Sequence, residues 1–463
     1  MKNTYNLSYI IWLTLVATLG GLLFGYDTAV ISGTVGSLKN FLITPNGLGD
    51  FALGATVSSA LVGCIIGGII SGFLTNRLGR KKSLLVAAIL FFVSALGSGY
   101  PETLFFTHSE SSVGLMWMFN FYRIIGGIGV GLASAVCPMY IGEIAPADIR
   151  GRLVSWNQFA IIFGMLVVYF VNWGIANGQT IDWINNIGWR RMFVSEAIPA
   201  GLFCMLILFV PETPRYLVLT NQDEKALGVL SKIMGSKDKA SQILSEIKET
   251  VVEITKTRVF SYGKTVIIVG ILLSVFQQFV GINVALYYAP TIFESMGAAK
   301  GDSLMQTIIM GFVNVMFTVV AILTVDKWGR KPLLITGSIG MAIGMFAISI
   351  LAFNSIIGIS TLVFIIIYTA SFMMSWGPIC WVLISEIFPN KIRGHAVAIA
   401  VAAQWTANYI ISSTFPPMLE FSAGMAYAIY GFMSVLSALF VWKMVPETKG
   451  KTLEEMNKLW KKK

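Results

Sequence analysis

Glu143 to Gly151 reads EIAPADIRG and Glu386 to Gly394 reads EIFPNKIRG, so one nine-residue signal occurs twice in the chain. Two shorter signals repeat in the same order. Gly-Arg-Lys at 79–81 returns at 329–331, and Pro-Glu-Thr at 211–213 returns at 446–448. Three matched signals in one order and at nearly equal separation indicate a duplication. We therefore expect two halves with the same fold and a working site between them.

The composition predicts a membrane protein. The chain has 463 residues, of which 56% are hydrophobic and 12% charged, and its mean hydropathy is +0.75. Soluble domains usually have about 25% charged residues. A membrane-spanning helix needs roughly 20 mostly apolar residues. Twelve such stretches are present: 9–33, 53–75, 82–99, 115–140, 153–176, 189–210, 265–293, 304–326, 333–353, 359–382, 395–416 and 423–445. The expected fold class is an all-α membrane protein with 12 transmembrane helices in two six-helix halves related by duplication.

The chain is expected to divide into three parts. Residues 1–210 form the N-terminal six-helix half, 211–263 a cytoplasmic linker with short surface helices, and 264–463 the C-terminal six-helix half with a cytoplasmic tail. If both termini are cytoplasmic, most of the 33 Lys and Arg residues lie on the inner side, which is the usual bias of membrane proteins. The net charge of +10 is therefore attributed to the excess of Lys and Arg on the inner side of the membrane. It predicts contact with the lipid bilayer and no nucleic-acid partner.

Other motifs argue against a metal, a nucleotide or an enzyme active site. The four cysteines lie in or beside apolar stretches without metal-ligand spacing, so we expect buried residues and no metal site. The two Gly-Lys-Thr sequences, at 263–265 and 450–452, lack the earlier glycine of a phosphate-binding loop. The glycine-rich stretches 63–72 and 126–131 favour close helix packing. We therefore expect no cofactor, no direct use of ATP and no enzymatic activity.

Three charged residues lie deep inside predicted spans: Asp27, Arg123 and Glu196. A charge at the centre of a bilayer costs about 2.5 to 3.5 kcal/mol on insertion scales, so each needs a reason to be there. One interpretation is a structural ion pair. The other is a proton site, in which a buried carboxylate binds and releases a proton as the arginine moves relative to it. The presence of two carboxylates for one arginine favours the proton site.

A second group of polar residues in the spans is uncharged. Gln277 and Asn283 would point about 240° apart on a regular helix, so they converge on one ligand only if the helix opens near Gly281. Further amides, indoles and a phenol in the spans are Gln158, Gln278, Tyr287, Asn314, Trp381, Gln404, Trp405 and Asn408. Amides donate and accept hydrogen bonds, and aromatic rings stack on the C–H faces of a sugar. The set predicts a neutral polyhydroxylated ligand; the alternative is that the amides only bond helices to each other.

These motifs resemble those of the sugar porters of the major facilitator superfamily, and especially of its bacterial proton-coupled xylose symporters. The resemblance covers nearly the whole chain. Its markers are Asn76–Lys81, Gly142–Arg152, Pro211–Arg215, Gln277–Asn283, Asp326–Lys331 and Pro446–Gly450.

The resemblance also implies roles for individual residues. The residues implied to bind sugar are Gln158, Gln277, Gln278, Asn283, Trp381 and Gln404, with Phe24, Tyr287, Asn314 and Trp405 lining the cavity. Asp27 is implied to be the proton-coupling carboxylate, supported by Arg123 and Glu196. Related facilitators without proton coupling carry a neutral residue in place of Asp27. The xylose symporters have a sugar-facing glutamine where this chain has Met165, and glucose-carrying relatives tend to be apolar there. The choice between a pentose and a hexose therefore stays open.

The resulting hypothesis is a sugar:proton symporter for D-xylose or a related pentose or hexose, working by alternating access as a monomer in the cytoplasmic (inner) membrane of a bacterium. The charges of the repeated loops are expected to pair across the cytoplasmic face as a gate that holds the outward-open state. These are Arg80, Glu143, Arg150, Arg330, Glu386 and Arg393. A proton-independent facilitator and a membrane sugar sensor are the alternatives. The presence of Asp27 argues against the first, and the short termini argue against the second.

Overall fold

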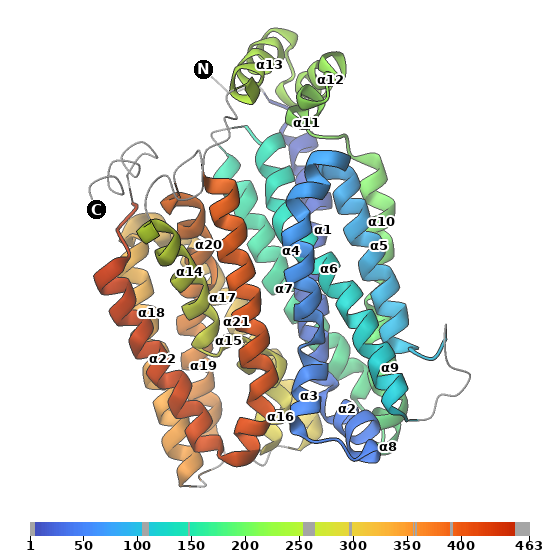
Figure 1. The fold of residues 1–463 in the computed structure, drawn as a ribbon, viewed down its shortest axis with the longest axis vertical. Helices are drawn as coiled ribbons and strands as arrows, with labels where there is room; N and C mark the ends of the chain where they lie inside the picture. Colours follow the sequence, from blue (N-terminus) through green and yellow to red (C-terminus); the bar gives the residue numbers. More distant parts are fainter. Residues whose placement is uncertain are drawn as a thin grey trace.

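Two helical bundles lie side by side, with a group of short helices beyond one end (Figure 1). The computed structural model describes residues 5–103, 111–146, 149–252, 264–295, 299–354, 356, 359–388 and 392–449. All regular elements in these ranges are helices.

The first bundle contains the N-terminal half of the chain. Its long helices begin or end at the repeated loop motifs. Its elements are α1 (Leu7–Val30), η1 (Ile31–Gly33), α2 (Val35–Leu38), η2 (Lys39–Ile43), η3 (Thr44–Asn46), α3 (Asp50–Val57), α4 (Ser59–Leu78), α5 (Arg80–Gly99), α6 (Val113–Ile144), α7 (Arg150–Ala176), α8 (Ile181–Trp183), η4 (Ile184–Gly188), α9 (Trp189–Ser195), α10 (Ala197–Leu206) and η5 (Ile207–Phe209).

The second bundle contains the C-terminal half. Its elements are α14 (Lys264–Phe279), α15 (Ile282–Tyr287), α16 (Ala289–Ser295), α17 (Lys300–Trp328), α18 (Arg330–Phe353), α19 (Ile359–Met373), α20 (Trp376–Ile387), α21 (Arg393–Phe421) and α22 (Ala423–Met444).

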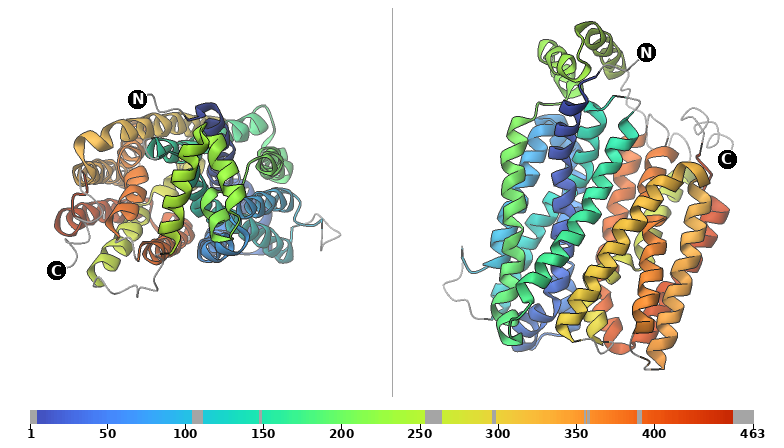
Figure 2. Two further views of the ribbon diagram at one scale, coloured as in Figure 1. Left: turned by 90° about the horizontal axis from the view of Figure 1, so that it is seen from above. Right: turned by 180° about the vertical axis from the view of Figure 1, so that it is seen from behind.

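In the sequence, three short helices connect the two bundles, and in space they lie outside both. They are α11 (Pro214–Leu219), α12 (Asp223–Met234) and α13 (Lys237–Val252). Two opposite side views place them beyond one end of the first bundle (Figures 1 and 2). The backbone N–H of Asn6 donates to the Ile233 carbonyl at 2.8 Å, so α1 begins at this end. We call this end the linker face, and the opposite end, which carries α2 and α8, the far face. The three short helices lie within the predicted linker 211–263, of which residues 253–263 lie outside the described ranges.

Eleven helical stretches in the described part of the chain are long and apolar enough to cross a membrane. The remaining predicted span, 395–416, lies in α21, a helix of 29 residues. Its sequence is less apolar because it carries Gln404, Asn408 and Ser412, whose side chains are buried inside the protein. The predicted all-α fold of two six-helix halves is confirmed.

Several predicted spans are interrupted helices. The sequence predicted an interruption only near Gly281, which lies between α14 and α15. The predicted span 359–382 consists of two helices, because α19 ends at Met373 and α20 begins at Trp376. The span 189–210 is likewise divided at Glu196. These interruptions place backbone groups without helical partners inside the bundle, where other side chains have to satisfy them.

Glycines allow α4 and α6 to approach closely, as their spacing predicted. A Cβ on Gly127 would lie 3.0 Å from the Cα of Gly63, and one on Gly131 would lie 2.6 Å from the amide nitrogen of Gly68. Side chains at these positions would push the helices apart.

The two bundles contact each other along α3, α4 and α21 on one side and α7 and α17 on the other. Packing is tight at the far face, where a Cβ on Gly54 would lie 3.1 Å from the Cα of Ser413. The bundles are therefore held together at the end opposite the linker helices.

Candidate functional site

The interruption between α14 and α15 brings the amides of the two helices together. Gly281 has a φ of +90°, a left-handed conformation that favours glycine. A Cβ there would lie 2.8 Å from the ring of Tyr430. The chain therefore turns at a position where both its backbone angle and the available space require glycine.

Four amide side chains form one hydrogen-bonded chain across this interruption. Gln278 Nε2 donates to Gln277 Oε1 at 3.2 Å, and Asn283 Nδ2 donates to Gln278 Oε1. Gln404 Nε2, from α21, donates to the same Gln277 Oε1 at 2.5 Å. The convergence of Gln277 and Asn283, which required an opened helix, is thus present in the structure, with Gln278 between them.

Gln277 is also held from the other side by the second interrupted helix. Its Nε2 donates to the Trp376 carbonyl at 2.9 Å and to the Gly377 carbonyl at 3.3 Å. Both carbonyls belong to the first turn of α20. Because both polar ends of this buried amide are bonded, its orientation is well determined.

Aromatic residues from both bundles lie next to the amides. The rings of Phe24 in α1 and Trp405 in α21 have centroids 5.7 Å apart. Asn408 Nδ2 donates to the Tyr287 hydroxyl at 3.3 Å. Phe24 therefore brings an aromatic ring of the first bundle against the amide-bearing helix α21.

Three of the predicted sugar ligands are not joined to the amide chain by any hydrogen bond among the described residues. Asn314 is buried, and Gln158 and Trp381 are half-buried. Among all the predicted sugar-site residues, three buried polar atoms make no hydrogen bond in the described structure: Gln404 Oε1, Trp405 Nε1 and Asn314 Oδ1. They supply two acceptors and one donor that a polyhydroxylated ligand can satisfy.

The charged residues form a separate buried cluster within the first bundle. Arg123 Nη1 donates to Asp27 Oδ1 at 2.6 Å, and Arg123 Nη2 donates to the Asp27 carbonyl at 3.0 Å. Asp27 and Glu196 are 0% exposed, and Arg123 is 1% exposed. Glu196 interacts electrostatically with both residues. With both carboxyls ionised, the cluster would carry a net negative charge away from water, which one proton neutralises.

Close helix packing makes room for this cluster. A Cβ on Gly126 would lie 3.2 Å from Asp27 Oδ1. Asp27 follows Phe24 by three residues on α1, so the two side chains lie on neighbouring positions of one helix face. One helix thus carries both the carboxylate and the aromatic contact with the other bundle.

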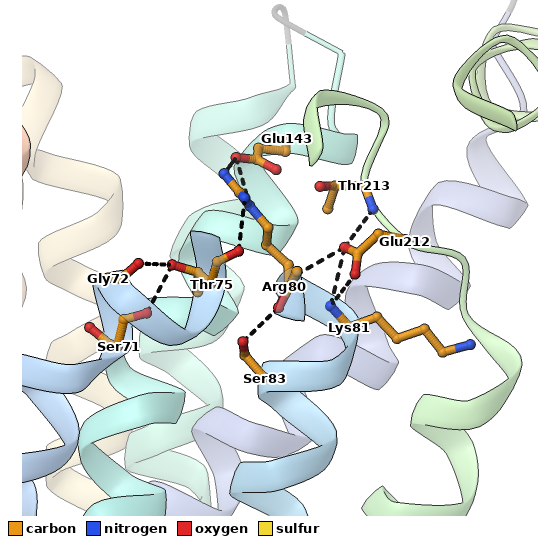
Figure 3. A network of polar contacts seen from close by, with 10 residues as sticks. Ser71, Gly72, Thr75, Arg80, Lys81, Ser83, Glu143, Glu212 and Thr213 are labelled. Carbon is orange, nitrogen blue, oxygen red and sulfur yellow. Dashed lines mark hydrogen bonds and ion pairs between the residues drawn. The ribbon is translucent and has the colours of Figure 1, made fainter. Parts of the chain in front are cut away.

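The repeated charges form a third group at the linker face (Figure 3). Arg80 Nη2 donates to Glu143 Oε1 at 2.8 Å, and Arg80 Nη1 donates to the Thr75 carbonyl at 3.4 Å. Glu212 lies beside them and accepts from the backbone N–H groups of Arg80 at 3.0 Å and Lys81 at 3.1 Å. It therefore caps the first turn of α5, where helical amides have no partner within the helix. Burial raises the pKa of Glu212, and these N–H donors and the Arg80 charge oppose the rise.

The second half repeats the arrangement. Arg330 Nη2 donates to Glu386 Oε1 at 3.1 Å. Glu447 accepts from the backbone N–H groups of Arg330 at 3.1 Å and Lys331 at 2.9 Å, as Glu212 does in the first half. Glu447 is less buried. Burial raises its pKa, but the N–H donors outweigh that effect, so the pKa is lowered overall.

The ion pairs of both loops join helices of the same half. The predicted pairing across the two halves concerns the outward-open state and stays a prediction. Glu143 Oε2 is buried and makes no hydrogen bond in the described structure, whereas Glu386 Oε2 accepts from Thr448 Oγ1 at 2.6 Å. Arg150 donates to the Ala145 carbonyl at 3.4 Å. The side chain of Arg393 lies outside the described part of the structure.

Residues 13–460 match the family model described as "Sugar (and other) transporter". The chain belongs to this transporter family. The D-xylose-proton symporter of Escherichia coli (strain K12) is 56% identical over 479 residues, which cover 99% of this chain and 97% of that protein. The glucose transport protein of Synechocystis sp. is 42% identical, covering 98% of each. The xylose transporter XylE from E. coli, solved in an inward open conformation, is 55% identical in sequence. Its structure matches this one with a TM-score of 0.89, and the match covers 98% of this chain and 100% of that chain.

Two features of this sugar transporter were missed by the sequence analysis. Glu212 and Glu447 served only as marks of duplication and of the family resemblance, although their matching place in both repeats was a usable signal of a shared structural role. The interruption at Met374 and Ser375 also had a usable signal. Gly377 and Pro378 lie in the first turn of α20, and a proline inside an otherwise helical stretch indicates a helix break or start just before it.

Proposed function

We propose that this protein is a proton-coupled sugar symporter, which takes up D-xylose or a related monosaccharide by alternating access. The observation that carries the proposal is the buried Asp27–Arg123 ion pair beside Glu196, in which Asp27 lies on the same helix as Phe24. A charged cluster this deep in a membrane protein is costly unless it is used. The chain is a transporter and not an enzyme, since the relatives that cover it are transporters.

Sugar binding is assigned to the amide chain and the rings around it. Gln277, Gln278, Asn283 and Gln404 provide donors and acceptors that rearrange to meet hydroxyl groups, and Phe24 and Trp405 provide apolar faces. Gln158, Tyr287, Asn314 and Trp381 complete the proposed cavity. Met165 is buried in α7, where its apolar side chain suits a ligand that makes no hydrogen bond at this position. Because relatives are named for xylose and for glucose, both sugars are candidate ligands of this set of residues.

Proton coupling is assigned to Asp27, with Arg123 and Glu196 in support. Protonation of Asp27 weakens its attraction to Arg123, which frees α1 to move together with Phe24. Sugar and proton then change the relative stability of the two conformations, as a coupled carrier requires.

The gate is assigned to the repeated charges at the linker face. The contact between Gly54 and Ser413 at the far face, and the similarity to an inward open structure, support an inward-facing arrangement of the two halves. The linker face is then cytoplasmic, with both termini on that side. In the outward-open state, Glu143 and Glu386 would meet the arginines of the opposite half. The proposed site of action of this multi-pass monomer is the inner membrane of a bacterium, with the lipid bilayer as its surroundings.

Uptake into proteoliposomes with an imposed pH gradient, acidic outside, tests the proposal. The symporter is expected to concentrate radiolabelled xylose or glucose above the outside level, and to stop doing so when a protonophore removes the gradient. A facilitator would reach equal concentrations in both cases, and binding without flux would indicate a sensor. A competition series with xylose, glucose, galactose and arabinose identifies the preferred sugar.

A further inference from the structure

The two interrupted helices of the second bundle face each other. In the interrupted helix formed by α14 and α15, the amide of Gly281 donates to the Gln278 carbonyl at 2.9 Å, and that of Ala285 donates to the Gly281 carbonyl at 3.2 Å. These backbone hydrogen bonds leave the Val280 carbonyl without a backbone donor. An unbonded carbonyl inside a membrane protein costs several kcal/mol. The Tyr368 hydroxyl, from α19, donates to the Val280 carbonyl at 2.8 Å and satisfies it.

The second interrupted helix receives a bond in return. Gln277, at the end of α14, donates to the Trp376 and Gly377 carbonyls in the first turn of α20. Tyr368 lies on the other segment of the same interrupted helix, α19. Each interrupted helix thus donates one buried side chain to a backbone carbonyl at the interruption of the other.

A packing role alone does not explain the hydroxyl of Tyr368. Tyr427 and Tyr430 are buried in the same region, and neither hydroxyl makes a hydrogen bond in the described structure. Tyr368 and Tyr427 both line a small apolar cavity of about 10 Å³ behind α15, together with Val284, Ala285 and Ile348.

We propose that Tyr368 is a positioning residue for the sugar site. Its bond to the Val280 carbonyl holds the turn at Gly281, and this turn determines where Gln278 and Asn283 meet. Tyr368 itself lies behind the turn and acts through α15. The inference rests on the proposed function, because it assigns to these amides the binding of sugar.

The test compares Tyr368→Phe with Tyr427→Phe in the full-length protein. Both variants remove one buried hydroxyl beside the same cavity, but only the first removes a hydrogen bond. We expect the Kd for xylose or glucose to rise about tenfold in Tyr368→Phe, because the binding-competent turn is less populated. The KM for exchange should rise by a similar factor, with kcat within about twofold of the wild type. Tyr427→Phe should match the wild type in both.

A second measurement does not depend on sugar. Amide hydrogen exchange at residues 281–287, without ligand, should be faster in Tyr368→Phe than in Tyr427→Phe, because the first turn of α15 opens more often. Equal exchange in the two variants, or equal sugar affinity, would overturn the inference. A wild-type protein that binds no sugar would contradict the proposed function instead, while the exchange comparison would still decide the role of Tyr368.

Discussion

Replacing Asp27 by Asn should separate sugar movement from proton movement while preserving the fold. Asn has nearly the shape of Asp, and its Oδ1 can still accept the bond that Arg123 Nη1 makes at 2.6 Å. The second bond, from Arg123 Nη2 to the backbone carbonyl at 3.0 Å, does not involve the side chain of residue 27. The variant cannot bind and release a proton at this position.

The expected loss of stability is moderate. Removing one partner of a buried ion pair costs about 3–5 kcal/mol when the other charge is left uncompensated. Glu196 remains beside Arg123 in this variant and is completely buried with it. We therefore expect about 1.5–3 kcal/mol, the range for a hydrogen bond to a charged group.

The expected loss of function is much larger. One pH unit corresponds to 1.36 kcal/mol, or a factor of about ten. With one proton per sugar, a gradient of two units therefore supports about 100-fold accumulation by the wild type. The variant should only equilibrate sugar across the membrane, so the ratio of the inside to the outside sugar concentration should stay near one.

Proteoliposomes provide both measurements. Accumulation under a pH gradient reports coupling, and exchange of labelled for unlabelled sugar at equal pH reports movement of the loaded carrier. Asp182→Asn, which changes an exposed carboxylate in α8, is the matched control and should behave as the wild type. The reasoning is refuted if Asp27→Asn accumulates sugar as well as the wild type does.

Three further predictions concern the gate, the turn and the linker face. Neutralising Glu143 or Glu386 to Gln should favour the inward-open state and impair accumulation, with sugar Kd within about twofold; an unchanged conformational balance, measured by cysteine accessibility at the two faces, would contradict the gate. Gly281→Ala should cost about 1–3 kcal/mol of stability, measured by thermal unfolding, because φ there is +90° and a Cβ would crowd a ring; unchanged sugar affinity would contradict the role of the turn. Because the pKa of Glu212 is raised above 4.5, its contribution to stability is present at low pH and is lost as the pH rises through the raised value. The wild type should therefore gain melting temperature relative to Glu212→Gln as the pH falls from 7 toward 4.5. The pKa of Glu447 is lowered, so its contribution holds above pH 4.5 and is lost as the pH falls below that value; the wild type should lose melting temperature relative to Glu447→Gln only in that acid range.

Local patterns in the sequence predicted the helices and much of the candidate site. Apolar stretches of membrane length predicted the spans, because a backbone in lipid must satisfy its own hydrogen bonds. The spacing of Gln277 and Asn283 predicted an opened helix, because a regular one would point them apart. Gly281 was the plausible position, since glycine alone tolerates a φ of +90° without strain.

The sequence could not predict contacts between distant parts of the chain. The roles of Glu212 and Glu447 depend on carboxylates that reach helix starts more than 100 residues away. The domain boundaries at 210 and 263, and the role of each proposed ligand, stay predictions.

Sequence by itself determined the duplication, the twelve spans and the types of side chain available for sugar and proton, because these depend on composition and local spacing. Tertiary structure alone decided which partners those side chains meet. Asp27 meets Arg123 across 96 positions of the chain, and Tyr368 meets Val280 across 88. Such pairs form because burial leaves a charge or a carbonyl without water, and only the packed helices determine which donor lies within reach.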